Sequence, residues 1–374
     1  MMKDVMGLIY TGENDARLRE LTVTRAIAAM PVAGRYRVID FLVSSMVNAG
    51  LKNIGIITQK NYHSLMDHIG SGKEWDLHGK NNGLHILPPF LTRENVGVYP
   101  GLLDALRSNS NFLIRSKQET LVLSNSNIIY NAHLDEMLQF YHDTNADITL
   151  MYTKDPSMKR DEYGTYLAID GNGNVTDMEV LPTHPGYDNV YMEVLIVKRT
   201  VLRDLVDKAV SHGYHDLCKD VILRIVQEKS AKVNAYEYKG KCWNIESVQS
   251  YFKFNMEILD PAVRKELFPD DLPVFTKVRD EMPALYGDNA TVVNSLVADG
   301  CQVEGIVENS ILFRGVKIAP DAHIKNCIIM QDGQVHEGAY IENCILDKQA
   351  IIKRNSRLIG PDAYPIVIGK DVVI

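Results

Sequence analysis

The sequence of 374 residues is longer than one ordinary compact core, so two domains are expected. Its 45% hydrophobic and 24% charged residues are typical of soluble globular proteins, and its net charge of −8 argues against a general binder of nucleic acids or anionic membranes. We identify no signal peptide and no apolar run long enough to span a bilayer. The five cysteines form no CxxC pair, which favours unpaired thiols in a reducing cytoplasm; they stand at positions 218, 242, 301, 327 and 344.

The first two thirds of the chain alternate strand-like and helix-like stretches. Four short apolar runs bounded by polar turn residues are typical of buried strands in a mostly parallel sheet, and they cover residues 5–10, 53–58, 120–124 and 146–152. Helix-like segments accompany them, for example at 134–143 and 201–211. This alternation predicts a Rossmann-like α/β domain over residues 1–256, with its ligand at the carboxyl ends of the strands.

The last third contains a repeat. Four similar six-residue segments lie at 292–297, 307–312, 324–329 and 341–346, and their asparagines recur at intervals of 15, 17 and 17 residues: Asn294, Asn309, Asn326 and Asn343. A finer six-residue period predicts a left-handed parallel β-helix over 286–374, in which about 18 residues make one triangular coil. The residues at this period, which we expect to point inward, are Ile306, Leu312, Ile318, Ile324, Met330, Leu346, Ile352 and Leu358.

Two smaller features complete the organisation of the chain. Proline and aspartate residues at 259–261 and 268–273 break any periodicity, so we interpret 257–285 as a linker. Cys327 and Cys344 occupy equivalent places in successive repeats. We expect both to be small buried core residues rather than a disulfide or a metal site.

Three segments are specific enough to compare with a known family. They read WDLHGKNNGLHILPP at 75–89, GRYRVIDF at 34–41 and VEGIVENSILF at 303–313. Together they resemble the bacterial glucose-1-phosphate adenylyltransferases, or ADP-glucose pyrophosphorylases, and the resemblance covers essentially the whole chain. It implies a role in bacterial glycogen synthesis, in which the family joins ATP and glucose 1-phosphate to give ADP-glucose and pyrophosphate, using Mg²⁺.

The loop after the first strand departs from this family. The family carries glycines at the places held here by Gly12, Glu13 and Asp15, and then an arginine at Arg17, so only Gly12 and Arg17 match. A carboxylate about 4 Å from a phosphate charge costs on the order of 4 kcal/mol at an effective dielectric of about 20. The added side chains also keep backbone N–H groups away from a ligand. Even if Glu13 and Asp15 form only a solvated loop or a helix cap, the loop predicts a poor triphosphate site.

Four charged positions of the family carry neutral residues here. The resemblance places Ile27 at the lysine that follows the loop and Leu181 at the sugar-phosphate lysine. It places Ser126 and Asn244 at the two Mg²⁺-binding aspartates, and neutral oxygens alone hold Mg²⁺ weakly. We therefore expect no intact catalytic set and no bound metal or cofactor on this chain, with Mg²⁺ held by a catalytic partner.

Other positions match residues that the family uses around nucleotide or sugar. They are Gly12, Arg17, Gln59, Gly83, Asp104 and Gly164. For all but Gln59 a structural role is also open, since glycines serve turns and an aspartate starts a helix.

The combined losses resemble the D-type regulatory subunits of the family, which accompany a catalytic subunit in Gram-positive bacteria and raise its activity within a mixed tetramer. The resemblance implies a non-catalytic or weakly active cytoplasmic subunit in such a heterotetramer, with a homo-oligomer as the form of the chain alone. Two alternatives stay open. The chain could itself be an active adenylyltransferase, or the β-helix could carry acyl transfer with His323 or His336 as the base.

Two arginines are candidates for an effector site. The family's activators are phosphorylated sugars or related anions, and Arg25 and Arg37 fall at positions associated with their binding. Paired arginines bind phosphate bidentately. The alternative is that both form surface or interface ion pairs.

Overall fold

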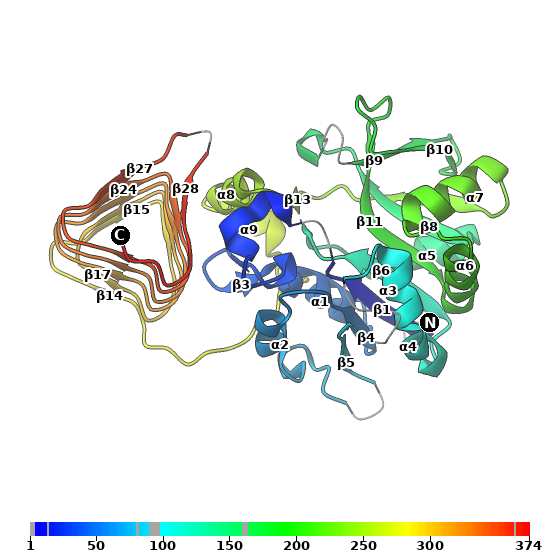
Figure 1. Ribbon diagram of the computed structural model, residues 1–374, viewed down its shortest axis with the longest axis horizontal. Helices are drawn as coiled ribbons and strands as arrows, with labels where there is room; N and C mark the ends of the chain where they lie inside the picture. Colours follow the sequence, from blue (N-terminus) through cyan, green and yellow to red (C-terminus); the bar gives the residue numbers. More distant parts are fainter. Residues whose placement is uncertain (1–3, 13–14, 80–81, 90–97, 159–163, 363) are drawn as a thin grey trace. The chain divides into compact units, whose positions relative to one another are not determined.

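The computed structural model describes residues 4–12, 15–79, 82–89, 98–158, 164–362 and 364–374 (Figure 1). These residues form two compact units, each assembled from segments that are distant in sequence. The sheet unit contains the described residues among 1–13, 41–243 and 270–275. The β-helix unit contains those among 14–40, 244–269 and 276–374. The predicted division into 1–256, 257–285 and 286–374 follows chain order, whereas these units do not.

A nine-stranded sheet forms the centre of the sheet unit. The strands lie in the order β10-β9-β11-β6-β1-β4-β5, and β8 pairs with both β11 and β12. β1 pairs in parallel with β4 and β6, while β11 runs antiparallel to β6 and β8. The bounds are β1 Val5–Tyr10, β4 Ile54–Ile57, β5 Leu84–Leu87, β6 Thr120–Asn125, β8 Ile148–Thr153, β9 Thr165–Ile169, β10 Val175–Val180, β11 Asn189–Lys198 and β12 Val233–Glu237.

Strands β1, β4, β6 and β8 confirm the four strands predicted from the sequence, with ends shifted by one or two residues. Every residue in them is buried except Asn125, which is half-buried at the carboxyl end of β6. These strands are covered on both faces, which explains why they read as continuous apolar runs rather than as alternating patterns.

Helices pack on this sheet. The predicted helices at 134–143 and 201–211 are confirmed as α5 Leu134–Thr144 and α6 Arg199–Ser211. Figure 1 shows α3, α4 and α6 as neighbours beside the sheet. The remaining α-helices of this unit are α2 His63–Ile69, α3 Leu102–Ser108, α4 Ser110–Arg115 and α7 Leu223–Glu228, and α1 Val38–Asn48 passes from one unit into the other.

The β-helix unit contains three parallel sheets, and the chain visits each sheet once per coil (Figure 1). The first sheet has β14 Leu285–Tyr286, β17 Gln302–Val303, β20 Lys317–Ile318, β23 Gln334–Val335 and β26 Ile351–Ile352. The second has β15 Thr291–Val293, β18 Ile306–Glu308, β21 His323–Lys325, β24 Tyr340–Glu342 and β27 Arg357–Ile359. The third has β16 Leu296–Val297, β19 Ile311–Leu312, β22 Ile328–Ile329, β25 Cys344–Leu346 and β28 Ile366–Ile368. The predicted parallel β-helix is therefore confirmed.

The same unit includes segments from outside the coils. They comprise short helical turns at Ala16–Thr22 and Ile27–Ala29, the hairpin of β2 Pro31–Val32 and β3 Tyr36–Arg37, and helices α8 Val248–Glu257 and α9 Pro261–Leu267. Helix α9 lies inside the segment 257–285. Pro261 occupies its first turn and the Asp260 side chain accepts a hydrogen bond from the backbone N–H of Ala262. Residues that we interpreted as breakers of periodicity thus start a helix.

Most coils contain 15 or 17 residues rather than a constant 18, and the last step along the third sheet, from Ile345 to Val367, spans 22. Thr291 pairs with Ile306, and Ile306 with His323. Because each 17-residue coil includes one five-residue step, a strict six-residue period drifts out of register. The core holds Val307 and Ile329 where the period predicted Ile306 and Met330; Ile306 is 37% exposed. The other residues predicted to point inward pack in the core or against it.

The repeated asparagines form one corner of the coils. Asn294, Asn309, Asn326 and Asn343 all have positive φ angles, between 45° and 52°. Asparagine tolerates this left-handed conformation better than other residues with a Cβ. The side chains also bond along the axis: Nδ2 of Asn294 donates to Oδ1 of Asn309 at 2.8 Å, and Nδ2 of Asn326 donates to Oδ1 of Asn343 at 3.2 Å.

The residue after each asparagine is small and hydrogen-bonded. Cys327 and Cys344 are buried and free of disulfides, and each thiol donates to a backbone carbonyl two residues earlier. Ser310 makes the same bond with its hydroxyl. The expectation of small buried core residues at the two cysteines is confirmed.

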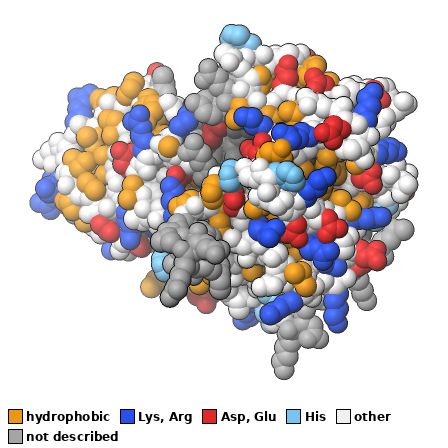
Figure 2. Space-filling view, turned by 45° about the vertical axis from the view of Figure 1, so that its right-hand side comes forward, with side chains coloured by type: hydrophobic (Ala, Val, Ile, Leu, Met, Phe, Trp, Pro, Cys, Tyr) orange, Lys and Arg blue, Asp and Glu red, His pale blue; other side chains and the backbone are white. Residues whose placement is uncertain are grey.

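Two observations concern the outside of the molecule. On the face that Figure 2 shows, Lys and Arg side chains are interspersed with Asp and Glu side chains rather than gathered into one basic surface. Among the described residues, no helix combines the length and the apolar character that crossing a membrane requires.

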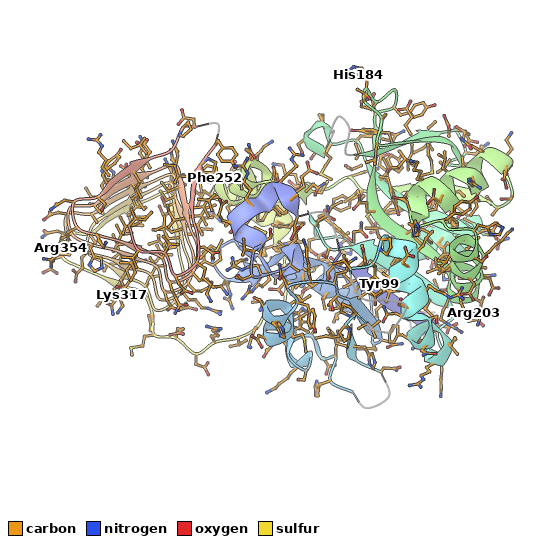
Figure 3. All side chains as sticks on the ribbon, in the orientation of Figure 1. Tyr99, His184, Arg203, Phe252, Lys317 and Arg354 are labelled. Atoms are coloured by element: carbon orange, nitrogen blue, oxygen red, sulfur yellow. The ribbon has the colours of Figure 1, made fainter. Side chains whose placement is uncertain are left out.

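The asparagine corner generates a stability prediction. Asn326→Val should lower the free energy of unfolding by about 2 kcal/mol, because a β-branched residue is strained at this φ angle and the bond to Asn343 is lost. Asn326→Gly should cost less than half of that, since glycine adopts the angle freely. Denaturant unfolding monitored by circular dichroism measures both. Lys317→Ala, on an exposed strand position labelled in Figure 3, is the control and should change little. Equal losses for Val and Gly would contradict the conformational argument.

Candidate functional site

A cavity of about 270 Å³ lies in the sheet unit where β1 and β6 reach their carboxyl ends. This is the location predicted for a ligand in an α/β domain of this kind. The cavity is lined by residues from several segments, including Gly12, Asn125, Leu181, Glu193, Asp216 and Cys218. It therefore brings together two positions that the sequence singled out, Gly12 and Leu181, with acidic residues that it did not.

The floor of the cavity at Gly12 is tightly packed. Gln59 Nε2 donates a hydrogen bond of 2.6 Å to the Tyr10 hydroxyl, and both side chains are buried. A Cβ at Gly12 would lie 2.4 Å from the Tyr10 oxygen and 2.5 Å from Gln59 Nε2. Gly12 is thus required by close approach of these side chains. The phenol of Tyr10 covers one side of the backbone that would have to meet a phosphate.

The predicted loop continues with Glu13 and Asp15. Glu13 lies outside the described residues. Asp15 precedes the helical turn Ala16–Thr22, and its backbone carbonyl accepts a hydrogen bond from the Leu18 N–H.

The far wall of the cavity has unusual backbone geometry. Glu193 lies in a bulge of β11 and has a φ of +57°, and Leu181 has a φ of +53° and is 55% exposed. Asn125 Nδ2 donates a 2.8 Å hydrogen bond to Glu193 Oε2, which fixes this carboxylate in the cavity. A glutamate and a leucine in left-handed conformations are held there only because the surrounding structure determines them.

The electrostatics of the cavity are negative. Glu193 and Asp216 contribute carboxylates, and none of its described lining residues is Lys, Arg or His. Burial, and after it the carboxylates of Asp216 and Glu193, raise the pKa of the Cys218 thiol well above its ordinary value. The same field that opposes a thiolate opposes phosphate oxygens. The described lining of the cavity therefore opposes the negative charge of phosphate groups.

The two positions that the resemblance assigns to Mg²⁺-binding aspartates carry neutral side chains here. Ser126 is buried directly after β6, and Asn244 is buried at the end of β13 Trp243–Asn244 in the β-helix unit. Among the described residues, no three His, Cys, Asp or Glu side chains are grouped to hold a metal ion. Ser126 and Asn244 offer neutral oxygens only, which hold Mg²⁺ weakly.

The remaining matched positions have structural contacts. Asp104 lies in the first turn of α3 with Oδ2 2.8 Å from His215 Nδ1. The Gly83 carbonyl accepts from Ile54 N–H, and the Gly164 carbonyl accepts from Leu181 N–H. These bonds give each of the three positions a structural role beside any ligand role.

Arg17 and Ile27 belong to the β-helix unit. The guanidinium of Arg17 lies 3.5 Å from the Glu246 carboxylate and is half exposed. Ile27 is buried in the turn Ile27–Ala29, as expected of an apolar side chain.

Arg25 lies in a buried ion pair within the β-helix unit. It is 2% exposed, and its Nη1 lies 2.8 Å and 3.0 Å from the two carboxylate oxygens of Asp347. It also donates to the carbonyl of Leu21 and contacts the Met330 sulfur at 3.8 Å. The ion-pair role that we considered for Arg25 is what the structure records.

Arg37 and Lys348 add cations to the same cluster. Arg37 is buried and donates to the Ala29 carbonyl; burial, followed by the charge of Arg25, lowers its pKa to about 10. Burial, followed by the charges of Arg37 and Arg25, lowers the pKa of Lys348 to about 7. We call Arg25, Arg37, Lys348 and Asp347 the cationic cluster. The buried carboxylate of Asp40 accepts a hydrogen bond from the Arg37 backbone N–H, and its charge partly offsets the lowering of the Arg37 pKa, so the three cationic side chains stand with two carboxylates.

Our sequence analysis missed Asp347 and Lys348, although a signal was present. Phe313, Met330 and Asp347 recur at intervals of 17 residues, so an acid replaces apolar residues in one column of the repeat. A charged residue in a buried column requires a buried partner.

The histidines proposed as bases for acyl transfer lie on the β-helix. His323 Nε2 is 3.0 Å from Glu308 Oε2, and its ring packs edge-on against Tyr340. Neither His323 nor His336 lines the cavity at the carboxyl ends of β1 and β6.

Comparison with known proteins identifies relatives over nearly the whole chain. Residues 6–261 match the nucleotidyl transferase family, and residues 282–364 match the GlmU-like C-terminal hexapeptide family. The glycogen biosynthesis protein GlgD of Bacillus subtilis (strain 168) is 36% identical over 99% of this chain and 96% of its own length. The glucose-1-phosphate adenylyltransferases of Thermotoga sp. (strain RQ2) and Geobacillus stearothermophilus are each 30% identical over 87% of this chain, and over 77% and 84% of their own lengths.

The sheet unit, the hexapeptide β-helix and these relatives agree with the resemblance found in the sequence. The chain belongs to the nucleotidyl transferases and, among them, to the ADP-glucose pyrophosphorylase family.

Proposed function

We propose that this chain is a glycogen biosynthesis protein that acts as a regulatory subunit, modulating ADP-glucose synthesis by a catalytic partner rather than performing it. The observation that carries the proposal is the acidic cavity with Glu193 and Asp216 in its wall, which also contains Gly12 and Leu181, two positions that the resemblance assigns to ligand binding. The similarity to a glycogen biosynthesis protein GlgD over nearly its full length supports the same assignment.

Nucleotidyl transfer needs several groups at once. A sugar phosphate oxygen attacks the α-phosphorus of a triphosphate, and catalysis consists mainly of positioning and charge neutralisation. Here the loop backbone is covered by Tyr10, and the wall carries Glu193 where a cation would assist. Ile27 and Leu181 stand at the family's two lysine positions. The loop, both lysine positions and both aspartate positions are altered together. This favours a non-catalytic chain over an enzyme with one altered residue.

The partner that fits this role is a catalytic glucose-1-phosphate adenylyltransferase subunit in a mixed tetramer. Such a subunit would supply the triphosphate site and Mg²⁺, while this chain would contribute contact surface and effector response. The alternative is an adenylyltransferase that works with unusual ligands. Gly12, Gln59 and Asp104 at family positions are the features that favour it.

The cationic cluster is the effector site that we propose for this chain. Asp347 pairs with Arg25, and the charge of Asp40 acts on Arg37, so three cationic side chains stand with two carboxylates. An anionic phosphate relieves this excess, because buried like charges repel one another. A phosphorylated sugar is the ligand class that agrees with the known activators of the family.

The regulatory assignment predicts two assay results. The purified chain alone should show no ADP-glucose synthesis and no pyrophosphorolysis above background. Mixed with a catalytic subunit, it should change that subunit's rate or effector response. Appreciable turnover by the isolated chain would favour the active-enzyme alternative. No effect on the partner would leave only a scaffold role.

The acidic cavity predicts weak nucleotide binding. Calorimetry with ATP and Mg²⁺ should detect no binding tighter than about 1 mM, because carboxylates near the phosphates oppose it. The combined variant Glu13→Gly, Asp15→Gly, Ile27→Lys, Ser126→Asp and Asn244→Asp should bind more tightly, whereas single reversions should not, since these groups act as a unit. Tight, Mg²⁺-dependent binding by the unaltered chain is the contrary result.

The cationic cluster predicts a pH dependence. Phosphate favours the protonated form of Lys348, whose pKa in the folded chain is about 7, so binding takes up a proton above that pH. The affinity for fructose 1,6-bisphosphate should fall about tenfold or more from pH 6.5 to 8.5. Lys348→Arg keeps the charge and should bind with little pH dependence, while Lys348→Met should bind weakly throughout.

The lowered pKa of Lys348 also determines how the stability of the chain depends on pH. Measuring this dependence is the control for the binding experiment. The pKa of Lys348 is lower in the folded chain than in the unfolded chain, so folding disfavours the protonated form. Stability should therefore rise as the pH increases from 7 toward 10, and Lys348→Met should remove this rise. An unchanged pH profile in both measurements would show that Lys348 is not the titrating group.

A further inference from the structure

A second cavity in the sheet unit shares no lining residue with the first. Its volume is about 790 Å³, within the range of small-molecule sites. It lies between the edge strand β5 with Pro88 and Pro89 on one side and the segment 108–118, which includes α4, on the other. Nothing in the nucleotidyl-transfer argument uses this cavity.

The charge of this cavity is opposite to that of the first. Arg115 and Lys117 line it, and none of its described lining residues is Asp or Glu. Both side chains are exposed, and neither forms an ion pair with a described residue. Two neighbouring cations that line a hollow and pair with no described carboxylate are suited to an anionic group.

The floor of the cavity is an ordered amide network. Asn53 and Gln118 are buried, and Asn53 Nδ2 donates to Gln118 Oε1 at 3.0 Å and to Ser116 Oγ at 3.3 Å. Gln118 Nε2 reaches Asn82 Oδ1 at 3.4 Å. Asn111 adds a further exposed amide. Amides both donate and accept hydrogen bonds, so they suit a ligand with several hydroxyl groups.

The wall of the cavity carries flat apolar surface. The rings of Phe112 and His85 lie with centroids 5.3 Å apart at 55°. Phe112 is held against β4, where a Cβ at Gly55 would come within 2.6 Å of its ring. Aromatic faces next to hydrogen-bonding groups complement the apolar and polar faces of a sugar ring.

We infer that this cavity binds a sugar phosphate, with Arg115 and Lys117 on the phosphate and the amides and rings on the sugar. Cations alone would suit inorganic phosphate, and amides with rings alone would suit a neutral sugar. The combination within one hollow favours a single ligand that carries both groups. The site is distinct from the cationic cluster, whose residues all belong to the β-helix unit.

The experiment is a calorimetric titration of the full chain carrying Lys348→Met, which weakens the cationic cluster. Glucose 1-phosphate should bind this variant saturably. Adding Arg115→Ala and Lys117→Ala should weaken binding about tenfold or more, because charge-assisted hydrogen bonds to phosphate are lost. Asn111→Ala should weaken it several-fold. The matched control is Arg203→Ala, an arginine on the outer side of α6 that is labelled in Figure 3, and it should leave binding unchanged.

Titrations with inorganic phosphate and with maltose separate the two halves of the ligand. Both should bind much more weakly than glucose 1-phosphate. Inorganic phosphate binding as tightly would overturn the sugar contribution, and maltose binding that ignores Arg115 and Lys117 would overturn the phosphate contribution. An absence of saturable binding, or equal affinity after the double substitution, would overturn the site itself. Because Arg115 and Lys117 are exposed, unchanged thermal unfolding should confirm that the variants fold. No partner subunit is present, so the outcome does not depend on the regulatory assignment.

Discussion

The ion pair of Arg25 and Asp347 is the interaction on which the β-helix unit depends. The two residues are 322 positions apart, and both are almost completely buried. Removing two charges from water is costly, so neither side chain would be stable there without the other. Leaving one of them unpaired costs about 3–5 kcal/mol, which is a large part of an ordinary domain's stability. The pair therefore specifies how the segment 14–40 packs on the coils within this unit.

The same pair links structure to charge. Asp347 balances one guanidinium, while burial and the charges of Arg37 and Arg25 lower the pKa of the half-buried Lys348. The unit is held together by a carboxylate that satisfies only part of the positive charge around it. A bound anion would join Asp347 in balancing the cationic side chains that are already grouped there. With the proposed effector site, one cluster would both anchor the N-terminal segment and bind an anion.

The strands and the repeat corners could be predicted from the sequence, because burial and backbone conformation restrict which residues occur in them. The strand at 5–10 is apolar since it is covered on both faces, and the recurring asparagines mark corners that need positive φ. Register was less predictable: a five-residue step within each coil puts Ile329 in the core in place of Met330. The Arg25–Asp347 pair and the bulge at Glu193 were out of reach, because both arise from segments that meet only in the folded chain.

The loss of the phosphate cradle extends beyond the charges seen in the sequence. Tyr10 and Gln59 pack against Gly12, so the one glycine kept in the loop now accommodates neighbouring side chains. Glu193 is fixed by Asn125 and by a left-handed backbone, so it cannot simply turn away from a ligand. The packing of Tyr10 and Gln59 against Gly12 and the carboxylate of Glu193 each oppose a triphosphate. They are independent, so removing one would leave the other. Both features therefore support the proposed regulatory role, in which the chain would act through its surfaces rather than through nucleotidyl transfer.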